Sequence, residues 1–207
     1  MNTIEKKNHW NNIYKNKNVD EVSWYQPIPK TSLEYVKGFD LPKTAKIIDV
    51  GGGDSFFVDH LLNLGFQNVT VLDISKEAIE KAKKRLGKKA AFVKWIVSDV
   101  TKFEPTEVYD LWHDRAVFHF LTEEKDVKTY LQTISIESRG MLVIGAFSED
   151  GPKKCSGIDI KQYSVESMTE CMKPRFNLTD HKIVNHHTPF DTVQNFVFCS
   201  FTPELQF

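Results

Sequence analysis

The stretch KIIDVGGGDS, residues 46–55, decides the fold of this chain. Its first five residues form an apolar run typical of a buried strand, and three glycines end that run. Apolar side chains then recur at helical spacing from Phe56 to Leu64, and Gly65 suits the end of a helix. Glycine lets a backbone turn tightly and approach a ligand where a Cβ would clash. The stretch therefore predicts a strand, a ligand-binding turn and a helix, although a plain glycine-rich turn is the alternative.

The alternation of strand and helix patterns continues outward from this stretch. In such an arrangement the sheet is mostly parallel, and ligands bind beyond the carboxyl ends of its strands, where the strand order reverses. We therefore expect an α/β fold, a doubly wound sheet with helices on both faces. Two long apolar runs near the chain end are typical of an antiparallel pair. The expected strands are 46–50, 69–73, 92–97, 109–113, 141–147, 176–184 and 194–201, and the expected helices are 56–64, 75–86, 127–134 and 164–172.

Composition limits the class of protein. The 207 residues suit a single domain, and an apolar content of 41% excludes a largely disordered chain. A net charge of -1 gives no sign of a large nucleic-acid footprint. The three cysteines are odd in number and match no zinc spacing, which favours a reducing, cytoplasmic compartment. Because the sequence contains no signal-like or long apolar segment, we expect neither secretion nor membrane insertion.

Acidic residues end the next two expected strands. Asp73 ends the second strand, where a carboxylate could accept two hydrogen bonds from a ribose diol. Asp99 ends the third, where it could accept from an adenine amino group while Val100 lines the ring. Together with Asp49 these acids should share one edge of the sheet, which favours a nucleoside ligand. Each acid taken alone could be a helix cap or a turn residue. Phe56 replaces the third glycine of a dinucleotide fingerprint, which disfavours a nicotinamide dehydrogenase.

These segments resemble the class I S-adenosylmethionine-dependent methyltransferases, because IIDVGGGDS, VTVLDIS and VSDV occur in the order of that family over residues 45–147. The resemblance implies S-adenosylmethionine as cofactor and a Rossmann-like, seven-stranded sheet whose last strand is antiparallel. It implies that the glycine loop holds the methionine moiety, the second-strand acid the ribose and the third-strand acid the adenine. Asp54 departs from many members, which carry glycine or another small residue there. The expected cofactor residues are Asp49, Gly51, Gly52, Gly53, Asp73, Ile74, Asp99, Val100 and Trp24.

The fourth expected strand belongs to the stretch YDLWHDRAVFHF, residues 109–120, which should form the floor between cofactor and acceptor. This stretch is similar to the Trp-Asp-Arg segment of thiopurine and related thiol methyltransferases, and to the Asp-Lys/Arg segment of some small protein-lysine methyltransferases. A nearby cation would favour the thiolate of a thiol acceptor, whereas an amine acceptor must lose a proton to a base. Core histidines and a structural charge pair are the alternatives. The candidate catalytic residues are His113, Asp114, Arg115, His119 and Tyr25.

The N-terminal residues 1–29 are polar and aromatic with little periodicity. We expect an irregular or partly helical arm whose aromatic residues Trp10, Tyr14, Trp24 and Tyr25 close the site as a lid or serve as packing anchors. Aromatic faces also attract a cationic sulfonium. The candidates for that contact are Trp24, Tyr25, Trp112 and Phe118.

Two segments near the chain end, residues 151–157 and 186–189, should rise over the sheet beside the acceptor pocket. Cys155 lies in the first, and His186 and His187 lie in the second. The spacing of these three side chains is not diagnostic of a metal site, and we expect no metal.

The chain is interpreted as one methyltransferase domain, residues 1–207. Its expected parts are an arm or lid (1–29), a cofactor-binding core (30–150), and a substrate-side loop with terminal antiparallel strands (151–207). The expected function is methyl transfer from S-adenosylmethionine to a small-molecule acceptor, such as a thiol or other soft nucleophile. The alternatives are a protein-lysine methyltransferase, with a protein as substrate, and a non-catalytic adenosyl-ligand-binding protein. We expect no nucleic-acid or membrane partner, and either a monomer or a homodimer.

Overall fold

The computed structural model describes residues 1–173 and 175–204, and their side chains except those of residues 135–139. Residues 174 and 205–207 belong to the expected substrate-side region and lie outside the described part. The strands of one sheet are β1 (Lys46–Val50), β2 (Asn68–Asp73), β3 (Val93–Val97), β4 (Tyr109–Arg115), β5 (Ser138–Phe147), β8 (Phe176–His187) and β9 (Val193–Pro203). A separate short hairpin consists of β6 (Lys154–Cys155) and β7 (Ile158–Asp159).

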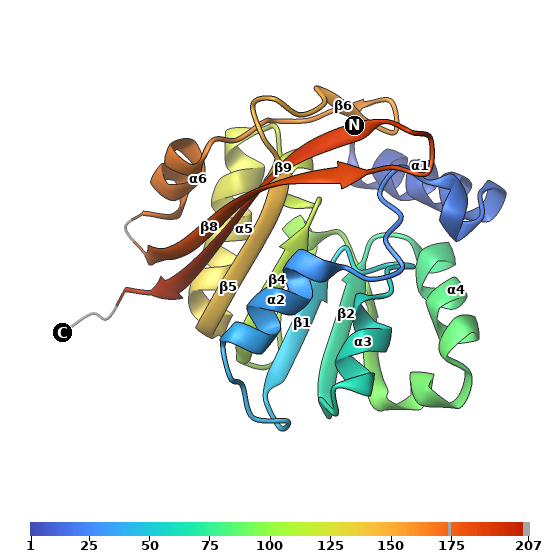
Figure 1. Cartoon of the computed structure of the whole chain (residues 1–207), viewed down its shortest axis with the longest axis horizontal. Coiled ribbons are helices and arrows are strands. Elements are labelled where there is room, and N and C mark those ends of the chain that lie inside the picture. The colour runs from blue at the N-terminus through green and yellow to red at the C-terminus, as the bar shows by residue number, and fades with distance from the viewer. Residues whose placement is uncertain (174, 205–207) are drawn as a thin grey trace.

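The seven-stranded sheet has the order β3-β2-β1-β4-β5-β9-β8 (Figure 1). Strand β1 pairs in parallel with both β2 and β4, and β4 pairs in parallel with β5. Strand β9 runs antiparallel to both of its neighbours, β5 and β8. The expectation of a mostly parallel, Rossmann-like sheet with an antiparallel last strand is therefore confirmed. The strand order reverses between β1 and β4, and the carboxyl ends of these strands mark the expected ligand site.

The helices divide between the two faces of the sheet. Alternation along β1 sends Ile47 to a core shared with α2 and α3, and Ile48 to a core shared with α5 and α6. Figure 1 shows α2 and α3 in front of the sheet and α5 behind it. The α-helices are α1 (Thr3–Asn16), α2 (Lys30–Gly38), α3 (Phe57–Asn63), α4 (Lys76–Leu86), α5 (Glu124–Glu137) and α6 (Val165–Met172), and the 3-10 turns are η1 (Val19–Glu21), η2 (Gly87–Phe92), η3 (Val100–Lys102) and η4 (Phe118–Phe120).

Helix α4 shows how closely the local sequence specifies this fold. The Ser75 hydroxyl caps its N-terminus by accepting a hydrogen bond from Ala78 N, and a cationic last turn precedes Gly87. Ala78, Ile79 and Ala82 are fully buried on one face. All three features agree with the expected helix.

The N-terminal arm is more regular than its sequence suggests. Asn2 and Glu5 form a capping box at the start of α1, which then runs for 14 residues. The helix packs beside α4 and near the carboxyl ends of the parallel strands (Figure 1). Its polar contacts include Asn11 Oδ1, which accepts from Ser75 Oγ at 2.9 Å. The tertiary contacts explain why a helix of low amphipathicity forms here.

Helix α2 was not expected, because Pro27 and Pro29 in the sequence suggest that no helix continues past them. In the structure Pro29 immediately precedes the first helical residue, a place where proline removes no helical hydrogen bond. Leu33 and Val36 bury one face of α2 against the sheet. None of the helices described is both long enough and apolar enough to cross a membrane.

Candidate functional site

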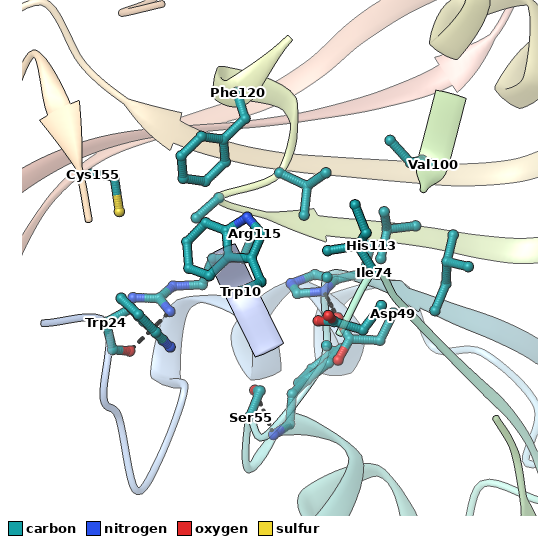
Figure 2. Close-up of a pocket in the computed structure, with 18 of the residues that line it drawn as sticks. Trp10, Trp24, Asp49, Ser55, Ile74, Val100, His113, Arg115, Phe120 and Cys155 are labelled. Carbon is teal, nitrogen blue, oxygen red and sulfur yellow. Dashed lines mark hydrogen bonds and ion pairs between the residues drawn. The ribbon is translucent and has the colours of Figure 1, made fainter. Parts of the chain in front are cut away.

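A pocket lies at the carboxyl ends of the parallel strands, and residues of α1 and β9 also line it (Figure 2). Its position matches the reversal of strand order. Among its lining residues are ten of the candidates from the sequence: Asp49, Gly51, Gly52, Asp73, Ile74, Asp99, Val100, Trp24, His113 and Arg115.

The glycine loop leaves room for two carboxylates. Gly51 has φ +70° and Gly53 has φ +37°, a region that side chains disfavour. A Cβ on Gly52 would lie 2.4 Å from Asp49 Oδ2, and a Cβ on Gly53 would lie 2.6 Å from Asp73 Oδ2. Gly53 does not itself line the pocket, but its missing side chain keeps the Asp73 carboxylate accessible. The loop is therefore specific for glycine at successive positions.

Asp54 and Arg85 brace the same loop from outside. The Arg85 guanidinium donates to the Asp54 carboxylate, and its Nη2 donates to Asp59 Oδ2 at 2.9 Å and to Ser55 O at 2.8 Å. The guanidinium also lies 4.4 Å from the centre of the Phe56 ring. Asp54, which departs from the family pattern, thus holds the loop rather than facing the main pocket.

Asp73 combines a buried position with a free hydrogen-bonding edge. Its Oδ1 accepts from Ser75 N at 2.7 Å. Burial, with a smaller contribution from the nearby charge of Asp49, raises the pKa of Asp73 to about 7 despite the hydrogen bond from Ser75 N. The protonation state of this carboxyl group is therefore sensitive to pH near neutrality.

Asp99 links the end of β3 to the N-terminal arm. Its Oδ1 accepts from the backbone N–H and the hydroxyl of Thr101, and its Oδ2 accepts from Thr3 Oγ1 at 2.9 Å. Burial alone would raise the pKa of Asp99, but these hydrogen bonds together lower it. The carboxylate keeps lone pairs for another donor, because each oxygen can accept more than one hydrogen bond.

Asp49, His113 and Ser32 form a buried chain of hydrogen bonds. His113 Nδ1 lies 2.7 Å from Asp49 Oδ1, and His113 Nε2 lies 2.8 Å from Ser32 Oγ. The imidazole packs against Phe57 at 4.2 Å between ring centres. Asp49 Oδ2 is enclosed and has no hydrogen-bond partner among the described residues. His113 thus fixes the orientation of the Asp49 carboxylate and leaves one oxygen for a ligand.

Arg115 lies at the end of β4 and lines the same pocket. Its Nη1 donates to Trp24 O at 3.2 Å, and its guanidinium carbon lies 5.1 Å from the centre of the Phe196 ring. Burial lowers the pKa of Arg115 to about 10, so the group stays cationic at neutral pH. The next residue, Ala116, has φ +71°, a strained conformation for a residue with a side chain.

Asp114 is not brought into the pocket. Its Oδ2 accepts from Tyr130 Oη at 2.6 Å, and its Oδ1 accepts from the backbone N–H groups of Val117 and Phe118. Burial raises the pKa of Asp114 to about 6. These contacts give Asp114 a structural part: it holds the turn that presents Arg115.

His119 and Tyr25 also lie outside the main pocket. His119 is fully buried, and its Nδ1 accepts from Phe147 N at 3.2 Å. Burial and the neighbouring charge of Arg115 lower the pKa of His119 to about 3, so it is neutral at physiological pH. Tyr25 lines an adjoining smaller pocket and packs against Phe56. The geometry therefore does not support a proton-transfer role for His119 in this arrangement.

The aromatic candidates for a sulfonium contact divide in the same way. Trp112 and Phe118 are fully buried in the core behind the sheet, so the expectation for these two residues is wrong. Trp24 lines the pocket together with Trp10 of α1, and their rings lie 5.7 Å apart in an edge-to-face arrangement. Phe120 continues this surface at 5.3 Å from Trp10.

The two segments near the chain end reach the site by different routes. Cys155 of the β6–β7 hairpin lines the pocket. His186 instead anchors the arm, because its Nε2 lies 2.7 Å from Ser23 O and its Nδ1 lies 3.1 Å from Gln26 Nε2. Within the described ranges no group of three or more His, Cys, Asp or Glu residues could hold a metal ion.

Several lining residues carry no local sequence signal. Ser32 comes from α2, which was not expected. Lys6 comes from α1, and the others belong to a core-like run on β9 and to the ends of β5 and η4, where the sequence alone indicates only burial. These residues are Ser32, Lys6, Phe120, Phe147, Gln194 and Phe196.

Comparison with known proteins gives an independent view of the same region. Residues 47–135 match the profile of the family described as a methyltransferase domain. Over 112 residues the chain is 28% identical to malonyl-[acyl-carrier protein] O-methyltransferase 2 of Ilyobacter polytropus, covering 54% of this chain and 42% of that protein. Over 105 residues it is 33% identical to the corresponding enzyme of Anoxybacillus flavithermus, covering 50% of this chain and 39% of that protein. The chain thus spans less than half the length of these two curated relatives.

Solved structures resemble the whole chain. A S-adenosylmethionine-dependent methyltransferase from Anabaena variabilis superposes with a TM-score of 0.76 at 17% identity, covering 99% of this chain and 96% of that one. The N-methyltransferase NodS from Bradyrhizobium japonicum, in complex with S-adenosyl-L-homocysteine, superposes with a TM-score of 0.70 at 15% identity, covering 99% of this chain and 100% of that one. At this level of identity the likeness shows the fold.

Proposed function

Because residues 47–135 match a methyltransferase domain, we propose that the chain is a class I S-adenosylmethionine-dependent methyltransferase whose acceptor is a small molecule. One observation carries the proposal: a single pocket joins three carboxylates near the ends of parallel strands to an aromatic surface that contains the Arg115 guanidinium. The carboxylates suit a nucleoside with a cationic amino acid tail, and the aromatic surface suits an apolar acceptor.

The residues of the pocket fit the cofactor by their chemistry. Asp73, Asp99 and Val100 line the pocket. In the proposal the Asp73 carboxylate would accept hydrogen bonds from a ribose diol, and Asp99 with Val100 would meet the adenine. The unpaired Asp49 Oδ2 suits the ammonium group of the methionine moiety, next to the glycine backbone. A bound S-adenosylmethionine supplies a methyl group that is already activated. The protein therefore has to align the acceptor and exclude water, which is a large part of the rate enhancement in such transfers.

The acceptor side favours a small, soft nucleophile over a protein lysine. Arg115 is cationic, so it would attract an acceptor that carries an anionic group and repel the ammonium form of a lysine side chain. Trp10 and Trp24 of the arm enclose this part of the pocket. His113 would act through Asp49 as a positioning residue, not as a base, since both of its ring nitrogens already have partners.

The proposal extends to the division of labour along the chain. Residues 1–29 would close the pocket as a lid, residues 30–150 would hold the cofactor, and residues 151–207 would shape the acceptor side. We also propose the cytoplasm as the location, because all three cysteines are free thiols.

Calorimetric titration with S-adenosylmethionine and S-adenosylhomocysteine tests the proposal first. Transfer of a labelled methyl group is then measured on the same sample, with a thiol panel and with a protein extract. Binding together with label in small molecules supports the proposal. Label in protein would favour the lysine alternative, and binding without transfer to either would favour the adenosyl-ligand-binding alternative. Absence of binding would overturn the whole proposal.

A further inference from the structure

Two cationic side chains line the pocket and are not used by the proposed cofactor contacts: Lys6, which lies 3.7 Å from Asp126, and Arg115, which has no acidic partner among the described ion pairs. Figure 2 shows Arg115, Trp24 and Cys155 on one side of the pocket, and Asp49 with His113 on the other. The lining residues proposed to hold the nucleoside thus lie away from the guanidinium. Arg115 faces the part of the pocket left for the acceptor.

The guanidinium of Arg115 lacks a counter-charge. Nη2 is enclosed and has no hydrogen-bond partner among the residues described, and no ion pair of the described chain includes Arg115. Asp49 attracts the cation through space, but its Oδ1 is occupied by His113. Burial raises the pKa of the neighbouring Cys155 thiol to about 11, so Cys155 is uncharged at neutral pH. An enclosed cation with an unused N–H donor costs folding free energy unless a ligand supplies the opposite charge and accepts the hydrogen bond.

The surroundings of Arg115 are apolar and flat. Trp10, Trp24, Phe120, Phe147 and Phe196 line this side of the pocket. Phe196 stacks under the guanidinium at 5.1 Å, and Phe147 lies 4.7 Å from Phe196 between ring centres. Such a surface binds an apolar or aromatic body and leaves orientation to a few polar groups.

The backbone around Arg115 is built to hold the side chain in place. Ala116 adopts a left-handed conformation, and the buried Asp114 carboxylate fastens the turn through Val117 and Phe118. Strain of this kind persists only where the surroundings impose it, and it is frequent at ligand-binding positions.

We propose that the acceptor carries a carboxylate on an apolar or aromatic body, and that Arg115 binds this carboxylate. The inference rests on the proposed methyltransferase function and adds the substrate class. A carboxylate matches the single positive charge of Arg115 and the planar geometry of a guanidinium. A phosphate dianion would bring a second charge that no unpaired cation of the wall neutralises, because Lys6 lies 3.7 Å from Asp126. The methylated atom lies elsewhere on the acceptor, so the carboxylate acts as a handle.

Paired probes test this inference on protein saturated with S-adenosylhomocysteine. Benzoate, phenylacetate and indole-3-acetate are titrated against their uncharged amides, and binding is followed by calorimetry. We expect at least one carboxylate to bind the unmodified protein about tenfold or more tightly than its amide, the size of one charge-assisted hydrogen bond. No preference in any pair would overturn the proposal.

Substitutions of Arg115 test whether this residue causes the preference for carboxylates over amides. In Arg115→Met the carboxylate preference should disappear while the dissociation constant of S-adenosylhomocysteine changes by less than about threefold. Arg115→Lys keeps the charge without the planar fork and should retain an intermediate preference. The matched control is Arg175→Met, an exposed arginine outside the pocket, which should change neither quantity. Thermal unfolding confirms that each variant is folded.

Two further outcomes separate this inference from the proposed function. If Arg115→Met weakens S-adenosylhomocysteine by about tenfold or more and leaves the carboxylate preference intact, Arg115 belongs to the cofactor site and the inference is wrong. If the unmodified protein binds no S-adenosylhomocysteine but still prefers carboxylates, the methyltransferase proposal fails while the anion site stands.

Discussion

The two sides of the pocket are made in different ways. The acid side consists of Asp49, Asp73 and Asp99, which lie at or close to the carboxyl ends of three neighbouring parallel strands. The aromatic side takes Trp10 and Trp24 from the arm, together with Arg115 and residues of β5, β9 and η4. On the acid side a local motif fixes each residue, because parallel strands bring their carboxyl ends to one edge. On the aromatic side only the tertiary fold brings the residues together.

The two sides also differ in how their charges are compensated. On the acid side each carboxylate accepts at least one hydrogen bond from a neighbour: His113 for Asp49, Ser75 N for Asp73 and Thr101 for Asp99. On the aromatic side the Arg115 guanidinium has Trp24 O as partner and keeps an unpaired N–H. The acid side is therefore preorganised for one defined ligand, whereas the aromatic side still needs an anion.

The largest effect is expected on the acid side, from Asp73→Ala. The substitution removes a carboxylate that is proposed to accept two charge-assisted hydrogen bonds. We expect the affinity for S-adenosylhomocysteine to fall by at least about 100-fold, from bonds worth about 1.5–3 kcal/mol each. Calorimetric titration measures the dissociation constant.

Two controls accompany this variant. Asp20→Ala removes an exposed carboxylate outside the pocket and should leave binding unchanged. Thermal unfolding of the unliganded Asp73→Ala protein should show a much smaller loss than binding does, because the buried carboxylate is already unfavourable as an anion. A folded variant that binds as tightly as the unmodified protein would remove the ribose assignment.

Removal of the arm should affect the aromatic side more than the acid side. Deleting residues 1–24 takes away Trp10, Tyr14 and Trp24 from the pocket and the Thr3 contact to Asp99. Turnover should fall by roughly 50-fold, in line with losses of about 100-fold when reacting groups are poorly positioned. The drop in S-adenosylhomocysteine affinity should be smaller, since the glycine loop and Asp73 remain.

The truncated protein is assayed by labelled-methyl transfer and by thermal unfolding. Tyr14 and Val22 are buried, so some loss of stability is expected. The lid interpretation requires that turnover falls more than the folded fraction at the assay temperature. Full activity in the truncated protein would contradict it.

The sequence predicted the elements whose signals are local. Strand β1, the glycine loop and α4 each carry an apolar period, a turn residue or a cap, and all three are found in the structure. Helix α2 was missed because Pro29 suggested the end of a helix, whereas it begins one. Helix α1 was only partly anticipated, because its regular form depends on contacts with α4 and Asp99 that lie far along the chain.

The candidate site, like the fold, could be predicted only where the sequence signal is local. Of the acid side, all three carboxylates line the pocket as expected. On the aromatic side, Asp114 and His119 were plausible catalytic residues by type. In the structure the register of β4 buries Asp114 in the core, and His119 is buried in the turn η4 that follows. Period-two alternation assigns faces only when the strand boundaries are known, and β4 extends past His113 to Arg115.

The acid side should also respond to pH. The pKa of Asp73 is about 7 in the folded protein, above its usual value of about 3.9, and only the anion can accept both ribose hydroxyls. S-Adenosylhomocysteine should therefore bind about tenfold more tightly at pH 8 than at pH 6, from the change in the ionised fraction of Asp73. The free energy of unfolding of the unliganded protein should change in the opposite direction. Because the pKa of Asp73 is higher in the folded than in the unfolded chain, its contribution to stability is fully present below about pH 4 and is lost as the pH rises through 7.

Calorimetry at the two pH values, in buffers of different ionisation enthalpy, measures the affinity and the protons released on binding. Asp73→Asn has no titrating group at this position and should bind weakly with little pH dependence. An affinity that is the same at pH 6 and pH 8 in the unmodified protein would show that Asp73 is already ionised before the ligand binds.

The smallest effect is expected where the two sides meet the adjoining pocket, from Tyr25→Phe. The centres of the Tyr25 and Phe56 rings lie 6.1 Å apart, and phenylalanine at position 25 keeps this ring contact. Tyr25 lines the adjoining pocket together with Gln26 and Asn18, and it does not line the main pocket. Labelled-methyl transfer should therefore change by less than about twofold, the usual range for a group that makes no transition-state contact. A loss of about 100-fold with unchanged S-adenosylhomocysteine binding would make Tyr25 a catalytic residue, and it would mean that the arm shifts during turnover and carries the hydroxyl group into the main pocket.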